Sequence, residues 1–147
     1  MAEISWAELA IDRFFAARTT PTQEQCDQTA RLIALASAVL PVNIPGSLSY
    51  TVVCTGRQLQ QKDIIVSFRD AGSELDSAII EQAREIHGCL VPEVKYHGIM
   101  SGAEPPLAIY AMSYLPGIPC LDVLSCVSQI DSQDITRHIC HMKHLAK

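Results

Sequence analysis

The most constraining feature of the sequence is a nearly continuous apolar run at residues 107–115 that stops at a Pro-Gly dipeptide. A short apolar run bounded by turn residues is typical of a buried strand. Proline has no amide hydrogen for a sheet ladder and glycine favours turns, so the strand is expected to end there. The segments 121–128 and 135–147 then have helical character. A strand that leads out of a sheet into a separate helical region indicates a hinge.

Composition limits the class of protein. The chain has 147 residues, 48% hydrophobic and 18% charged, so it can bury a core as one domain or as a piece of a larger one. Its net charge is −5 and its basic residues are scattered, which argues against nucleic-acid binding. No apolar run reaches membrane-spanning length, and the N-terminus lacks the pattern of a signal peptide. We therefore expect a cytoplasmic protein with no membrane partner.

Capping residues predict three helices before the hinge. The first begins at Ser5, which forms a capping box with Glu8, and runs to about Ala17. The second begins in the segment Thr20-Pro21-Thr22-Gln23, where Thr20 is the expected N-cap, and continues until Pro41 ends it.

The third predicted helix covers residues 74–87, with Ser73 as its N-cap and Gly88 as the residue after its C-terminus. Its apolar residues recur at helical spacing. This stripe consists of Leu75, Ala78, Ile79, Ala83 and Ile86.

Segments rich in β-branched and aromatic residues predict four strands, at 48–55, 63–69, 93–99 and 107–114. The first two are close enough in sequence to form only an antiparallel hairpin. The expected fold is α+β: an antiparallel sheet with an inserted helix, preceded by two helices. We divide the chain into N-terminal helices (1–40), the sheet with its helix 74–87 (41–115), and a hinge with the first helices of another lobe (116–147).

Four segments in this order resemble one known family. They are "IPGSLSYTVVC", "DIIVSFRD", "AREIHGCLVPEVKYHG" and "PLAIYAMSYLPG". Together they resemble the small lobe of the aminoglycoside phosphotransferases, which are kinase-like enzymes, and the likeness is closest to the fungal branch. It covers roughly residues 10–147, and its most specific part runs from "LVPEVKYHG" to "MSYLPG". The resemblance implies a protein-kinase-like small lobe, with ATP and Mg²⁺ as the family's cofactors.

The resemblance also implies a set of nucleotide-binding residues. The family's nucleotide loop corresponds to Gly46, Ser47 and Ser49, although this chain has one glycine fewer and no Asn there. Arg69 corresponds to the cation that contacts the α- and β-phosphates. Met112, Ser113 and Leu115 correspond to the hinge that holds adenine. In the family this cation pairs with a Glu on the helix. Here that residue would be Glu81 or Glu85; if the corresponding position is Ala78, the pair is missing.

The family's catalytic segment has no counterpart in these residues. It carries an H-x-D-x-x-x-x-N loop and a later Asp in the large lobe, but no His here has Asp two positions on, and Asn43 is the only Asn. We therefore expect no catalytic residue, no kinase activity from this chain alone, and weak or absent ATP binding. A small-molecule hydroxyl acceptor would need the large lobe, and the exposed hinge face favours self-association.

Two other interpretations remain besides a truncated phosphotransferase. One is a non-catalytic interaction module that binds a partner protein through a kinase-like lobe. The other is a metal-binding protein, because Cys140 lies among His138, His141 and His144. These histidines spread around a helix, so a solvated helix end fits them better.

Six cysteines show no C-x-x-C pair and read as reduced thiols rather than as a disulfide framework. A nucleophilic thiolate would need basic neighbours, which Cys54, Cys89 and Cys120 lack in the sequence.

Overall fold

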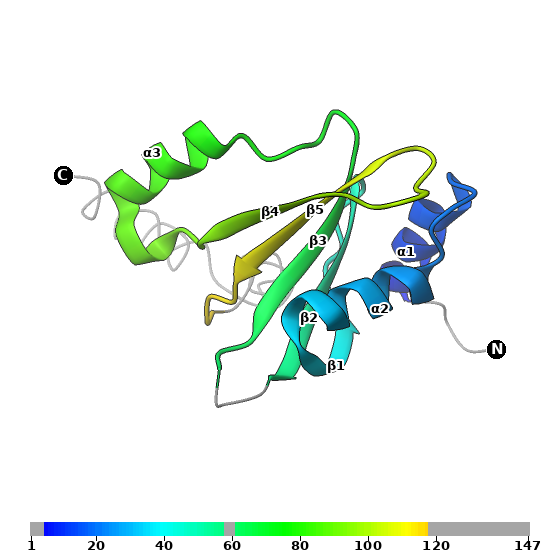
Figure 1. Ribbon diagram of the computed structural model, residues 1–147, viewed down its shortest axis with the longest axis horizontal. Coiled ribbons are helices and arrows are strands. Elements are labelled where there is room, and N and C mark those ends of the chain that lie inside the picture. The colour runs from blue at the N-terminus through cyan, green and yellow to red at the C-terminus, as the bar shows by residue number, and fades with distance from the viewer. Residues whose placement is uncertain (1–4, 58–60, 118–147) are drawn as a thin grey trace, which may run out of the picture. The chain divides into compact units, whose positions relative to one another are not determined.

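The computed structural model describes residues 5–57 and 61–117, and the first compact unit of the chain ends at Leu115. The predicted helices at 121–128 and 135–147 lie outside the described residues, as does the His138–His144 cluster. Figure 1 shows the elements of the first unit.

Helix α1 (Trp6–Ala16) begins as its sequence predicts. The Glu8 amide donates to the Ser5 hydroxyl at 3.2 Å, and the Ser5 amide donates to the Glu8 carboxylate at 2.8 Å. This reciprocal pair satisfies two amides that the first turn would otherwise leave without partners. The predicted capping box is confirmed.

Helix α2 (Gln23–Ala34) begins two residues later than predicted. Its N-cap is Thr22, whose hydroxyl accepts from the Gln25 amide, while the Gln25 side chain accepts from the Thr22 amide. The prediction of Thr20 was wrong because that residue bonds elsewhere: its hydroxyl donates to the Gly102 carbonyl, and its own carbonyl accepts from the Glu104 amide. A tertiary contact therefore overrides a plausible local cap.

The predicted continuation of the second helix to Pro41 is also wrong. Leu35 takes the left-handed conformation, with φ of 52°, and ends the helix. The chain then forms strand β1 (Ala36–Pro41), which pairs antiparallel with the next strand. Pro41 is tolerated because β1 lies at the edge of the sheet.

The sheet has five antiparallel strands in the order β1-β2-β3-β5-β4, with one helix between β3 and β4 in sequence (Figure 1). The predicted hairpin of the first two predicted strands is confirmed as the β2–β3 pair. The α+β class, with two preceding helices and an inserted helix, is confirmed. The strands after β1 are β2 (Ser49–Arg57), β3 (Ile64–Asp70), β4 (Val94–Ile99) and β5 (Leu107–Ser113).

Close packing of β1 on β2 requires a glycine at position 56. A Cβ atom there would lie 2.0 Å from the Ser37 Oγ atom, and the residue has a φ of +66°. Both the space and the conformation exclude other residues without rearrangement. Gly56 therefore allows the edge strand to approach its neighbour.

One face of the sheet carries the hydrophobic core, and we call it the covered face. Side chains of α2, with Phe14 of α1, pack on alternate residues of β2, β3 and β5. Figure 1 shows α2 lying across β2 on this side. The core consists of Phe14, Cys26, Ala30, Ala34, Ala36, Tyr50, Val52, Cys54, Val66, Phe68, Leu107 and Ile109.

Helix α3 (Ser77–His87) begins three residues later than the predicted boundary, and a short 3₁₀ turn, η2 (Gly88–Leu90), follows it. Its N-cap is Asp76, whose carboxylate accepts from the amides of Ala78 and Ile79. The prediction of Ser73 as the cap was wrong, because the Ser73 hydroxyl donates to the Asp70 carbonyl at 2.7 Å. No residue of α3 is buried.

Candidate functional site

The second face of the sheet, which we call the open face, brings together three of the predicted nucleotide-binding residues. Ser49 pairs directly with Arg69 across β2 and β3, and Met112 pairs with Ile65 across β5 and β3. Paired residues share a face, and so do residues two and four apart on one strand. Ser49, Arg69 and Met112 therefore lie on the same side of the sheet, opposite the hydrophobic core.

Hydroxyl groups line the centre of the open face. The hydroxyls of Thr51 and Ser67 lie 2.9 Å apart in a cross-strand hydrogen bond, and Thr51 also donates to Ser49 at 3.5 Å. Ser49 and Ser67 are buried, so each needs such a partner. Sequence reasoning missed Thr51 and Ser67, although the polar residues alternate with apolar ones along β2 and β3.

Arg69 is half-buried at the end of β3 and its guanidinium is held by the backbone. Its Nε atom donates to the Ser73 carbonyl at 2.6 Å. Within residues 5–57 and 61–117, its other two nitrogens make no hydrogen bond or ion pair. The guanidinium thus has a fixed orientation and keeps donors for a ligand.

The structure does not pair Arg69 with either predicted glutamate among the described residues. Glu81 lies on the side of α3 that lines a cavity facing β4 and β5, whereas Glu85 is exposed and does not line it. Ala78 lies in the first turn of α3 beside its N-cap.

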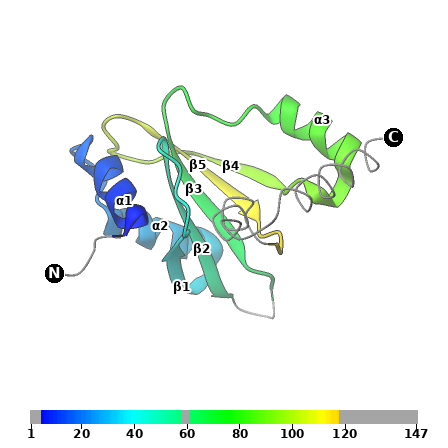
Figure 2. The same cartoon turned by 180° about the vertical axis from the view of Figure 1, so that it is seen from behind.

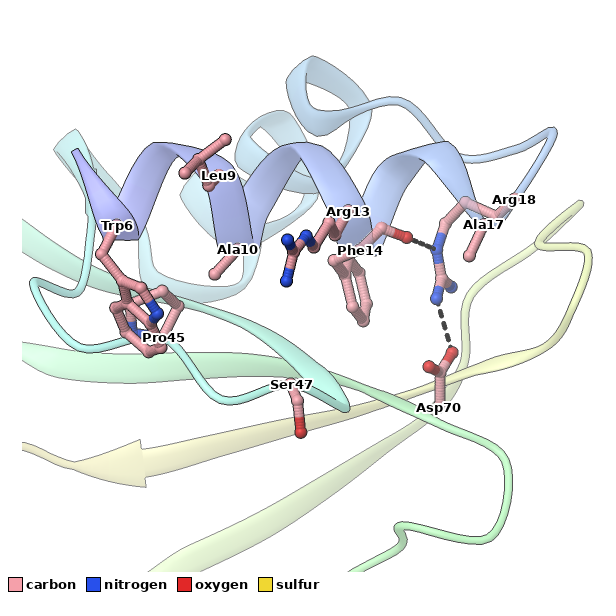
Figure 3. A pocket seen from close by; sticks show the side chains of 10 residues that line it. All are labelled: Trp6, Leu9, Ala10, Arg13, Phe14, Ala17, Arg18, Pro45, Ser47 and Asp70. Atoms are coloured by element: carbon pink, nitrogen blue, oxygen red, sulfur yellow. Dashed lines mark hydrogen bonds and ion pairs between the residues drawn. The ribbon is translucent and has the colours of Figure 1, made fainter. Parts of the chain in front are cut away.

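The loop between β1 and β2 carries the other predicted phosphate-binding residues. Gly46 and Ser47 are both exposed. A Cβ atom at Gly46 would lie 3.0 Å from the Ser49 hydroxyl oxygen, so a larger residue would crowd Ser49. Ser47 lines a separate cavity beside α1, and Figure 3 shows its hydroxyl pointing away from that helix.

The predicted hinge residues follow one another at the end of β5. Met112 is partly exposed on the open face. The Ser113 amide donates to the Glu93 carbonyl at 3.0 Å, and the Ser113 hydroxyl accepts from the Glu93 amide at 2.8 Å, so Glu93, the residue before β4, occupies both groups. Leu115 is 37% exposed beyond the strand, and its backbone has no hydrogen-bond partner among the described residues.

An ion pair that the sequence did not predict joins α1 to the end of β3. Arg18 donates to the Asp70 carboxylate at 2.6 Å and to the Phe14 carbonyl at 2.9 Å, and its guanidinium lies 3.8 Å from the centre of the Phe14 ring. These groups form one end of a cavity of about 250 Å³, with Trp6 and Pro45 at the other end (Figure 3). Asp70 neutralises Arg18, so this arrangement ties two elements together.

Titratable groups beside the core on the covered face bond to one another or are buried, and they serve the packing of α2 on the sheet. The Tyr50 hydroxyl donates to the Asp27 carboxylate at 2.7 Å and accepts from the Gln23 amide. Burial raises the pKa values of Asp27 and Tyr50, and it raises the pKa of the Cys26 thiol to about 12. At neutral pH Cys26 is therefore a protonated and inert thiol.

The other predicted chemistries gain no support from the described part of the chain. Cys26, Cys54 and Cys89 are reduced thiols there, with Cys89 exposed. No group of three potential metal ligands occurs among the described residues. Cys120 and the four residues of the proposed zinc site lie outside them. Within the same residues, no helix is both long and apolar enough to cross a membrane.

No protein-family model, curated protein or solved structure matches this chain.

Proposed function

We propose that the chain is a kinase-like small lobe that binds a nucleotide on the open face of its sheet. The observation that carries the proposal is the arrangement along β3. The loop with Gly46 and the Arg69 side chain lie at one end of the open face, and Met112 lies toward the other. Arg69 and the partner of Met112 are four residues apart, about 13 Å along a strand. That separation suits an extended nucleotide with its base and its phosphates at opposite ends.

Each end of the open face has the chemistry that this role needs. Arg69 is anchored through Nε, so its terminal nitrogens can fork to phosphate oxygens. The Met112 side chain supplies an apolar wall for adenine. Since the Ser113 amide already bonds to the Glu93 carbonyl, Leu115 would supply the backbone hydrogen bonds to the base.

The same proposal excludes phosphoryl transfer by these residues alone. Transfer needs a positioned base and magnesium ligands, and the sequence has no H-x-D-x-x-x-x-N segment. The family places those residues, and the acceptor site, in its large lobe. We therefore propose weak ATP binding without turnover, with any hydroxyl acceptor depending on a large lobe.

The test compares ATP with adenosine on the full chain, by amide chemical shifts in NMR. We expect ATP to shift signals near Arg69 and Met112, and we expect Arg69→Gln to weaken ATP binding about tenfold through loss of charged hydrogen bonds to phosphate. Adenosine has no phosphate, so its affinity should not change. Arg31→Gln is the matched control, because Arg31 is an exposed cation on α2, which packs on the covered face.

Two outcomes would contradict nucleotide binding. In the first, ATP shifts no signal near Arg69. In the second, Arg31→Gln weakens ATP binding as much as Arg69→Gln does, which would indicate nonspecific attraction to positive charge.

A second candidate function is a module that binds a partner protein. It rests on large apolar side chains that α3 and η2 leave in solvent: Ile79 is 64% exposed, Ile86 is 68% exposed and Leu90 is 77% exposed. Ile79 and Ile86 lie two turns apart on one side of the helix. If this surface causes self-association, the double variant Ile79→Ser with Ile86→Ser should lower the sedimentation coefficient. If the hinge face causes it, Leu115→Ser should have that effect. A wild-type chain that sediments as a monomer at high concentration would contradict self-association.

A further inference from the structure

A cavity of about 550 Å³ lies between α3 and the open face of the sheet, separate from the predicted nucleotide residues except for Glu81. One wall is the side of α3 that carries Ile80 and Glu81. The opposite wall consists of β4 and β5, whose tyrosines Tyr96 and Tyr110 face it. The volume lies in the range of small-molecule sites. Figures 1 and 2 show α3 on the far side of the sheet from α1 and α2.

Two carboxylates at the cavity have no cationic partner among the described residues. Glu81 forms no hydrogen bond or ion pair there. Glu74 accepts one hydrogen bond, from the Gly72 amide at 2.8 Å, and keeps its second oxygen for another donor. Both carboxylates lie beside apolar and aromatic surface, where a cation with an apolar body would find both kinds of contact.

The one arginine that lines the cavity is already neutralised. Arg84 donates to the Glu93 carboxylate at 3.1 Å, which pairs its charge with a group that does not line the cavity. The remaining charge at the cavity is that of Glu74 and Glu81. The local field therefore attracts cations, although exposure to solvent weakens it.

Two aromatic rings supply the second element of cation recognition. The ring centres of Tyr96 and Tyr110 are 5.2 Å apart, at an angle of 43°. The Tyr110 hydroxyl accepts from the Leu75 amide, which fixes its ring beside the start of α3. Tyr96 is 55% exposed, so one ring stays accessible to a ligand. Aromatic faces attract quaternary ammonium groups through their quadrupoles.

We propose that this cavity binds a small organic cation, with a substituted ammonium group between the tyrosine rings and the Glu81 carboxylate. The ligand class is a quaternary or tertiary amine with a short apolar body, because Leu75, Ile80 and Val94 supply aliphatic surface in the lining. This site does not depend on nucleotide binding, since Arg69 does not line it.

Choline and its uncharged isostere 3,3-dimethyl-1-butanol form a matched pair of probes. The full chain is titrated with each at low salt, and the amide shifts of Tyr96 and Tyr110 are followed by NMR. We expect choline to bind with a dissociation constant on the order of 1 mM, as a ligand of its size allows, and about fivefold more tightly than the alcohol. An equal affinity for both probes would overturn the proposal, and so would choline that shifts neither tyrosine.

Charge on α3 gives a second comparison. Glu81→Gln keeps the shape of the side chain and should weaken choline binding about threefold, whereas Glu85→Gln, on the same helix but outside the cavity lining, should leave it unchanged. Tyr96→Leu should weaken binding and Tyr96→Phe should preserve it, because the ring rather than the hydroxyl is needed. Equal losses from Glu81→Gln and Glu85→Gln would overturn the assignment of the site. ATP affinity, measured on the same variants, should not change with Tyr96→Leu or Tyr96→Phe.

Discussion

Arg18 and Asp70 differ in how much water reaches them, and this difference predicts different effects when each is replaced. The Arg18 side chain is 1% exposed and that of Asp70 is 26% exposed. Asp70→Ala leaves a buried guanidinium without its counter-charge and should lower the free energy of unfolding by about 3 kcal/mol. Arg18→Met removes the buried charge and leaves a carboxylate that water can solvate, so the loss should be smaller.

Urea denaturation of the two variants and the wild-type chain measures this asymmetry. Arg13→Met is the control, because Arg13 is an exposed arginine in the last turn of α1, close to Arg18 in sequence, without an ion pair to the described residues. A larger loss from Arg18→Met than from Asp70→Ala would show that the Arg18 contact with the Phe14 ring, rather than its charge pairing, dominates.

Single residues also show how far the sequence could identify the candidate site. The resemblance pointed to Ser49, Arg69 and Met112, which the sheet register places on one face. It could not reveal the Arg18–Asp70 pair, because the partners are 52 positions apart and nothing local couples them. Thr51 and Ser67 were available from the polar alternation of β2 and β3, but an isolated hydroxyl in a strand has little meaning until its cross-strand partner is known.

At the level of elements, helix starts were predictable only where no tertiary contact competed. Ser5 caps α1 as expected because its surroundings are exposed. Thr20 and Ser73 are equally good caps in isolation, yet the Thr20 hydroxyl donates to the Gly102 carbonyl and the Ser73 hydroxyl donates to the Asp70 carbonyl at the end of β3. Strand β1 was missed for a related reason: its residues continue a helical spacing, and only pairing with β2 makes them a strand.

The corrected start of α3 predicts a specific effect at its first turn. Asp76→Ala removes the acceptor of two amides and should destabilise the helix by about 1 kcal/mol, whereas Asp76→Asn keeps a good N-cap and should cost little. Amide hydrogen exchange at Ala78 and Ile79 reports the effect directly. Glu85→Ala on the same helix serves as the control. Unchanged exchange in Asp76→Ala would place the start of the helix elsewhere.

On the scale of the whole described unit, the two faces of the sheet are stabilised very differently. The covered face buries side chains from both N-terminal helices and from four strands. The open face has the buried hydroxyls of Ser49 and Ser67, the half-buried Arg69, a cavity and a helix with no buried residue. Nucleotide and cation binding are both proposed on the open face, away from the hydrophobic core. Regions with few buried contacts open most readily.

This division predicts a gradient of hydrogen exchange in the free chain. Amides of β2, β3 and β5 should exchange slowest, because they lie in central strands under the core, and those of α3 should exchange at least about 100-fold faster through local opening. Choline should slow exchange in α3 if it bridges the helix to the sheet, without changing β2. Measurement at two protein concentrations separates a property of one molecule from an effect of association. If α3 exchanged as slowly as β3 at both concentrations, its exposed isoleucines would have to be covered in solution, and the cavity beneath it would not be open to a ligand.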